Sequence, residues 1–165
     1  MGKFKNEIKG DKMAFDNRNR GRRNQNRGND EINEIISKIN GFEKLADMSV
    51  KEYADEGGFA DIVAKNSKGL NTNQLRKFFG AVRLMEQKES WEEIEPEFYL
   101  LKPRLAVSAG RKNIPRDFYN LMMATMRKVD VGTDEDKLKG FNNFVGFFES
   151  IVAYHKFYEE TRGFN

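Results

Sequence analysis

The C-terminal part of the chain carries apolar residues too broadly for a single stripe on a helix. Thr133, with Asp136 three residues later, predicts a capped helix start, and the acids at this start favour the positive end of the helix dipole. The helix should run from about Asp134 to Glu160. A helix apolar on so much of its circumference is central in a bundle or half-buried in a partner, and we expect both. Its apolar positions are Leu138, Phe141, Phe144, Val145, Phe147, Phe148, Ile151, Val152, Tyr154, Phe157 and Tyr158.

The rest of the chain from residue 30 also has helical periodicity, without the sustained alternation typical of a strand. At 165 residues the chain has room for one domain with a real core. The sequence therefore predicts an all-α fold, a compact bundle of five to six helices forming a single domain over residues 30–162. The first helix is expected from Asp30 to Gly41, and the second from Ser49 to Gly69, with Gly57-Gly58 as a candidate break. The third is expected over 70–88, with Asn71 or Thr72 as its N-terminal cap. The fourth should run from Glu92 or Pro96 to Ala109, with Gly110 as C-cap, and the fifth should begin at Pro115.

The first 29 residues differ sharply in composition from the rest. They hold nine Lys/Arg and three Asp/Glu, whereas the remaining residues hold 20 and 23, so the folded part is mildly acidic overall. Between Phe15 and Ile32 there is no large apolar side chain, so residues 1–29 should form a disordered arm. Such basic, amide-rich arms fold onto RNA or DNA, and a solubilising tail is an equally good interpretation.

Residues 70–88 place basic and amide groups on one helix face. Asn73, Arg76, Gly80, Arg83 and Gln87 share this face, which suits a phosphate backbone, although a solvated helix face is the simpler alternative. More cations follow in the next predicted helix and could meet this face if the two helices pack antiparallel. The candidate nucleic-acid-binding residues are Arg76, Lys77, Arg83, Lys102, Arg104, Arg111 and Lys112, with contacts to phosphate and sugar.

The sequence argues against an enzyme. There is no cysteine, and His155 is the single histidine, so thiolate zinc sites, cysteine nucleophiles and histidine metal clusters are excluded. The acids at residues 134–136 are explained by a helix start. We expect no catalytic residue, no metal and no cofactor. No stretch approaches the ~20 apolar residues that span a bilayer, and we expect a soluble, cytoplasmic protein with no membrane partner.

Two segments together resemble one family. Leu70-Asn71-Thr72-Asn73-Gln74-Leu75-Arg76-Lys77-Phe78 is similar to its motif Leu-Thr-Thr-Ser-Gln-(Ile/Leu)-Arg-(Lys/Arg). Leu101-Lys102-Pro103-Arg104-Leu105-Ala106-Val107-Ser108-Ala109-Gly110-Arg111 is similar to its motif Leu-Lys-Pro-(Arg/Lys)-Leu-Ala-Tyr-x-x-(Ala/Gly)-Arg, with Val107 at the usual aromatic position. The family is the small helical subunit of type III-A CRISPR effector complexes, the Csm complexes. The resemblance covers about residues 50–160 and leaves the basic arm unmatched.

The resemblance implies a non-catalytic protein of antiviral defence. Its implied partners are CRISPR RNA, target RNA, the RAMP-type backbone subunits and the large subunit, with several copies lining a filament. A second stripe of the last helix is then a candidate interface, formed by Phe147, Tyr154, Phe157 and Tyr158. The alternatives are a helical protein–protein adaptor without a nucleic-acid role, and the small subunit of a related type III-B or type I complex.

Overall fold

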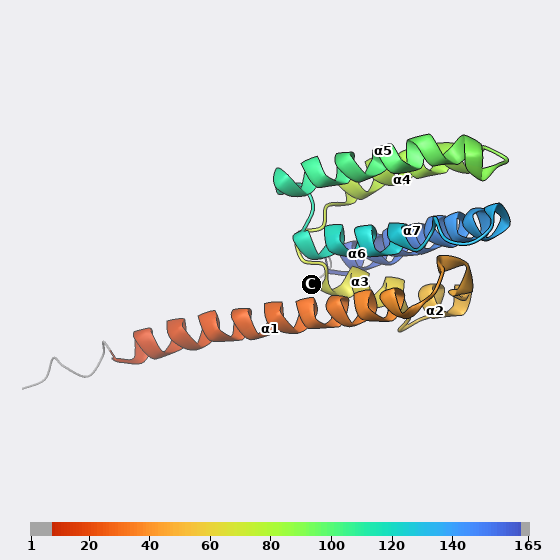
Figure 1. Ribbon diagram of the computed structural model, residues 1–165. Helices are drawn as coiled ribbons and strands as arrows, with labels where there is room; N and C mark the ends of the chain where they lie inside the picture. The colour runs from red at the N-terminus through yellow and green to blue at the C-terminus, as the bar shows by residue number, and fades with distance from the viewer. Residues whose placement is uncertain (1–7, 163–165) are drawn as a thin grey trace, which may run out of the picture.

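The computed structural model describes residues 8–162, and the side chains of residues 8–21, 24 and 25 are outside that description. The described part of the chain is helical and contains no strand, which confirms the predicted all-α class (Figure 1). Its elements are α1 (Ile8–Gly41), the 3₁₀ helix η1 (Leu45–Asp47), α2 (Val50–Ala54), α3 (Phe59–Asn66), α4 (Thr72–Glu86), α5 (Trp91–Gly110), α6 (Arg116–Arg127) and α7 (Asp134–Arg162).

The first half of α7 forms the centre of the bundle. All buried residues of α7 lie between Gly140 and Ile151, and they point in several directions around the helix axis. Phe144 and Phe141 pack edge-on against Phe98 of α5, with ring centroids 5.8 and 6.1 Å apart. Phe148 stacks on Phe79 of α4 at 5.8 Å. The apolar residues that the sequence places around much of this helix therefore pack against helices of the same chain on both sides of α7.

Two layers of helices enclose α7. In Figure 1, α4 and α5 lie together on one side of it, and α1, α2 and α3 lie on the other, while α6 runs beside it. α7 packs against α3, α4, α2 and η1, and α1 packs against α6 and α3. The buried amide of Asn143 fixes η1 on α7, because its Nδ2 donates to the carbonyls of Leu45 and Met48 at 2.9 Å each. Helices α4 and α5 thus form an outer layer with one face free.

Local signals explain most helix boundaries. The Asn71 Oδ1 accepts the backbone N–H groups of Asn73 and Gln74 at 2.8 and 3.3 Å, so the expected cap of α4 is confirmed. The reciprocal bonds between Thr133 and Asp136 at the start of α7 are also present, at 3.1 and 3.2 Å. The expected second helix is split into α2 and α3, where Gly57 adopts φ +74°, a left-handed conformation that favours glycine.

The end of α5 differs from the prediction. Gly110 is the last residue of the helix, and the left-handed residue is Lys112, with φ +60°. The Lys112 N–H donates to Ala109 O at 3.0 Å and the Asn113 N–H to Ser108 O at 2.9 Å, the bonding pattern of a Schellman motif. A non-glycine residue in this conformation costs roughly 1–2 kcal/mol. Lys112 is therefore held in place by the backbone bonds around it.

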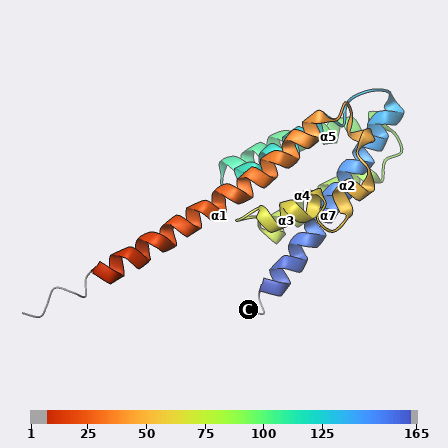
Figure 2. The ribbon, with the colours of Figure 1, turned by 90° about the horizontal axis from the view of Figure 1, so that it is seen from below.

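The start of α1 also differs from the prediction. The helix begins at Ile8, 22 residues before the expected Asp30, and its first part projects away from the bundle (Figures 1 and 2). Burial begins at Gly28, where an added Cβ would lie 3.2 Å from Asn66 O of α3, and continues with Ile32, Ile35 and Ile39. The part of the arm before residue 8 lies outside the described residues. Disorder of the arm in the free protein stays a prediction.

We predict that the amides of residues 8–26 exchange fast, whereas those of Ile32–Ile39 in the same helix are strongly protected. A single helix rich in Asn and Gly, without a packing surface, is marginal in water. Hydrogen exchange read by mass spectrometry measures both segments in one sample. Equal protection of the two segments would show that the arm is packed in solution, contrary to this expectation.

Candidate nucleic-acid interface

A groove between α4 and α5 brings three of the predicted cations together. Its volume is about 430 Å³, and Lys77, Arg104 and Arg111 lie along it. The lining contains no Asp or Glu, and none of the ion pairs among the described residues involves these three side chains. The other lining residues are amides and apolar or small groups: Gln74, Phe78, Ala81, Leu101, Pro103, Val107, Ser108 and Asn113. The groove is a site of uncompensated positive charge with apolar walls.

The α5 side of the groove is a regular row of donors. Arg104, Ser108 and Arg111 follow at spacings of four and three residues, which places them on one helix face. The row is about 10.5 Å long, from the rise of 1.5 Å per residue. Ser108 is only 6% exposed, and its Oγ has no hydrogen-bond partner among the described residues. A buried hydroxyl without a hydrogen-bond partner lowers the free energy of unfolding by roughly 1–3 kcal/mol.

The structure does not bring all seven predicted cations into this groove, because Arg76 and Arg83 lie outside its lining. Successive residues of a helix differ by about 100°, so Arg76 points away from the groove that Lys77 lines. Arg76 lies in a polar hollow of about 340 Å³ with Glu159 and Glu160 of α7. Arg83 pairs with Glu86 at 2.7 Å. Both guanidinium groups therefore have carboxylates nearby.

Lys102 and Lys112 also lie outside the groove lining. Lys102 sits over the ring of Tyr99, 4.6 Å from its centroid. Burial and the neighbouring charge of Arg127 lower the pKa of Lys102. The Tyr99 hydroxyl donates to Asp130, which raises the pKa of Tyr99 to about 12. Lys112 is exposed and directly follows Arg111, so it extends the basic end of the groove.

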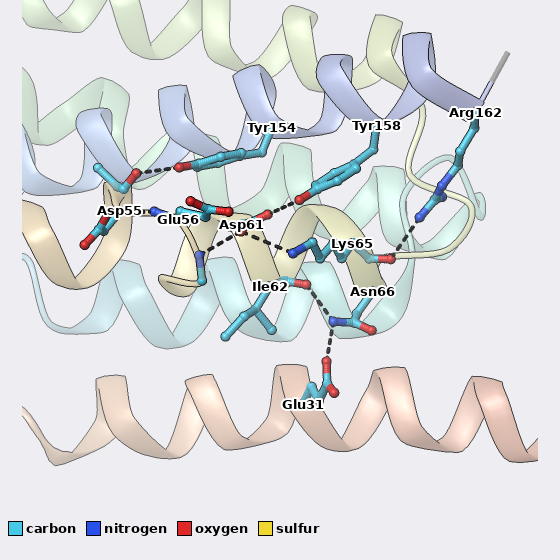
Figure 3. Close-up of polar contacts among 12 residues, drawn as sticks. Glu31, Asp55, Glu56, Asp61, Ile62, Lys65, Asn66, Tyr154, Tyr158 and Arg162 are labelled. Atoms are coloured by element: carbon cyan, nitrogen blue, oxygen red, sulfur yellow. Dashed lines mark hydrogen bonds and ion pairs between the residues drawn. The ribbon is translucent and has the colours of Figure 1, made fainter. Parts of the chain in front are cut away.

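The predicted interface stripe on α7 is largely used inside the chain. The prediction for Phe147 is wrong: it is fully buried and packs against Tyr53, with ring centroids 6.1 Å apart. Gly146 makes room for this contact, because a Cβ there would meet the Tyr53 ring. The hydroxyl groups of Tyr154 and Tyr158 point at α2 and α3 (Figure 3). Phe157 remains 56% exposed and is the member of the stripe still open to a partner.

A buried carboxylate holds the outer half of α7. Asp61, 1% exposed, accepts hydrogen bonds from Tyr158 Oη, from Gly57 N at 2.8 Å and from Lys65 Nζ at 3.3 Å (Figure 3). Burial alone would raise the pKa of Asp61, but the bonds from Tyr158, Gly57 and Lys65 outweigh it and hold the pKa below its usual value. Tyr154 adds a bond to Ala54 O at 2.7 Å.

His155 has a packing role at the opposite edge of α7. Its Nε2 lies 3.0 Å from Leu70 O and its Nδ1 lies 3.2 Å from Thr72 Oγ1, so it ties α7 to the start of α4. Among the side chains that the structure describes within residues 8–162, no group of three His, Asp or Glu is arranged to hold a metal ion. No helix in that range has an apolar stretch that would cross a bilayer.

Sequence reasoning missed Ser108, Gln74 and Asn113 as groove residues. Ser108 could have been found, because it falls between Arg104 and Arg111 at helical spacing. Gln74 and Asn113 could not, since their placement depends on how α4 and α5 pack. The outer surface of these helices also exposes Leu84, Leu100 and Val107, at 63, 55 and 52%.

Fold and groove together define a small all-α protein with a carboxylate-free basic groove between α4 and α5. The sequence model of the family Csm2 Type III-A matches residues 44–161. Over 115 residues the chain is 30% identical to a protein of Enterococcus italicus named "CRISPR system Cms protein Csm2", covering 66% of this chain and 80% of that protein. No solved structure gives a significant match. The chain belongs to the Csm2 family of type III-A CRISPR systems.

We predict that Asp61→Asn lowers the free energy of unfolding at pH 7 by about 1–3 kcal/mol, because three donors lose a charged acceptor. The folded-state pKa of Asp61 is depressed, so its stabilisation is present above the unfolded value of about 3.9 and is lost as the pH falls through the folded value. The difference between wild type and variant should therefore shrink between about pH 5 and pH 2. Urea unfolding across this range measures it.

The exposed Asp30 supplies the control, since Asp30→Asn should change the free energy of unfolding by less than about 0.5 kcal/mol. A loss for Asp61→Asn that stays constant down to pH 2 would show that the charge of Asp61 is not what anchors α7.

Proposed function

We propose that this chain is the non-catalytic small subunit of a type III-A CRISPR effector complex and contacts RNA through the α4–α5 groove. The observation that carries the proposal is the meeting of Lys77, Arg104 and Arg111 in a groove without a carboxylate. Guanidinium groups bind phosphate oxygens through two parallel hydrogen bonds, and a groove of this charge suits a polyanion. Membership of the Csm2 family supplies the context in which that polyanion is CRISPR RNA or its target.

The conformation of Lys112 supports a functional role for this end of α5. Lys112 is a non-glycine residue in a left-handed backbone conformation. Such a strained residue persists only where the surrounding structure holds it in place, and residues of this kind cluster at binding sites. Lys112 lies next to Arg111, at the end of the groove. A glycine at this position would relieve the strain and remove a cation. We infer that the positive charge is retained for binding.

The partners that we propose follow from the family. They are CRISPR RNA, target RNA, the RAMP-type backbone subunits and the large subunit, in a filament with several copies of this chain. Cleavage of nucleic acid would belong to the other subunits. The role in antiviral defence and the cytoplasmic location are parts of the same proposal. The type III-A family match favours this complex over the type III-B and type I alternatives.

We predict that the double variant Arg104→Ala/Arg111→Ala binds RNA at least about tenfold more weakly, because charge-assisted hydrogen bonds to phosphate are lost. The slope of log affinity against log salt should flatten by about 1.4, or ~0.7 for each single-strand phosphate contact. Fluorescence anisotropy of the full chain at several salt concentrations measures both quantities. The loss should be similar for different RNA sequences, since phosphate contacts carry no sequence information.

The matched control is Arg76→Ala/Arg83→Ala, which removes the same charge from α4 outside the groove. Its effect on affinity and slope should be small, because both arginines lie near carboxylates. If this control weakens binding more than the groove variant does, the RNA-binding face is the outer face of α4 that the sequence first indicated. If neither variant has an effect, the chain does not bind RNA through its folded part. That result would favour a helical protein–protein adaptor without a nucleic-acid role.

We also predict that Phe157→Glu weakens assembly of the complex while lowering the melting temperature by less than about 2 °C. Phe157 is more than half exposed, so a charge there meets water in the free chain but a neighbouring subunit in the complex. Phe147→Glu is the contrast, because it puts a charge into the core and should unfold the chain. Co-purification with the other subunits and thermal melting separate the two effects. Unimpaired assembly by Phe157→Glu would remove this residue from the interface.

A further inference from the structure

The α4–α5 groove combines features that a simple phosphate-binding surface does not need. Phe78, Leu101 and Val107 give it apolar walls, and Ser108 is among its lining residues, with a buried Oγ that has no hydrogen-bond partner among the described residues. Gln74 and Asn113 add amide groups, which can both donate and accept hydrogen bonds. Its volume of about 430 Å³ lies in the range of small-ligand sites. The groove therefore offers places for an apolar ring and for a phosphate together.

We propose that the groove binds single-stranded RNA with one base inserted between α4 and α5. The phosphates lie along the row Arg104–Ser108–Arg111, with Lys77 facing them from α4. A turn of the Ser108 side chain toward the groove then lets its hydroxyl donate to a phosphate oxygen, and the buried Oγ gains the partner that it lacks in the free chain. The base packs on Phe78 and Val107, with its edge within reach of the amides. This inference rests on the proposed function and names the form of RNA that the site takes.

Single-stranded RNA fits the groove better than the other macromolecules with negative charge. A base paired in a duplex has both faces stacked and cannot enter a groove, whereas the base of a single strand can be splayed out onto protein. Single-strand sites join a basic groove to apolar or aromatic surfaces. The row of three donors extends over about 10.5 Å along α5, which suits a chain of phosphates more than one isolated anion. A protein segment in the groove would have to be strongly acidic to provide carboxylate partners for Ser108 and the three cations.

The test compares an RNA oligonucleotide with the same oligonucleotide made abasic at its internal positions. The wild-type full chain should bind the complete RNA about tenfold more tightly, because a stacked base contributes to affinity. Ala81→Phe fills the groove without changing charge and should abolish this preference. Val107→Ala removes part of the apolar wall at an exposed position, cannot disrupt the core, and should reduce the preference by about threefold.

Ala153→Phe is the matched control for Ala81→Phe, because Ala153 is an exposed helical alanine outside the groove. It should keep the full preference. Thermal melting confirms that each variant is folded. The Arg104→Ala/Arg111→Ala variant should weaken binding of the complete and the abasic RNA alike, since phosphate is present in both.

Each other outcome overturns the inference in a recognisable way. Equal binding of complete and abasic RNA by the wild type, with the arginine variant still impaired, leaves the proposed function standing and removes base insertion. Binding of duplex RNA as tight as single strands, and equally sensitive to Ala81→Phe, also removes it. Unchanged RNA binding by Ala81→Phe together with lost self-association in sedimentation makes the groove a protein contact. No effect of the arginine variant on either RNA contradicts the proposed function itself.

Discussion

Burial of the first half of α7 is the constraint on which the rest of the structure depends. Its phenylalanines pack on α4 and α5 on one side and, through Phe147, on Tyr53 of α2 on the other, and α3 also packs against α7, so both layers take their position from one helix. Its one buried amide side chain, Asn143, uses both N–H groups of Nδ2 to hold η1. Glycine at 146 admits the Tyr53 ring, which a larger residue would displace. A change at these positions would therefore disturb both layers together.

The groove follows from this arrangement. Phe79 and Phe148 fix α4, Phe98 and Phe144 fix α5, and the two outer helices meet along one line whose outward side holds Lys77 and Arg104. The folded part of the chain is slightly acidic overall, yet the lining of this groove contains no carboxylate. Acidic side chains cluster elsewhere, for example beside Arg76. The packing of the helices thus places these cations and the acidic side chains on different parts of the surface. An anion is expected to bind where the cations have no carboxylate beside them.

The sequence predicted the helices well because their periodicity, caps and glycine breaks are local signals. It failed at α1, whose first part projects away from the bundle, and at the end of α5, where local backbone hydrogen bonds hold Lys112 in a glycine-like conformation. Of the cations that the sequence predicted to form one patch, only some lie together in the groove. Arg76 and Lys77 are neighbours in sequence yet face different helices, and which of them faces α5 is set by tertiary packing. Phe147 was misplaced because a gap opened by Gly146 is not visible in a helical pattern.

The proposed function places RNA on the α4–α5 layer of this Csm2-family subunit. Photocrosslinking with RNA that carries 4-thiouridine tests it most directly, with the crosslinked residues of the full chain mapped by mass spectrometry. Crosslinks are expected within residues 74–81 and 101–113, the two segments that line the groove. Crosslinks confined to α1 or to the outer half of α7 would contradict it.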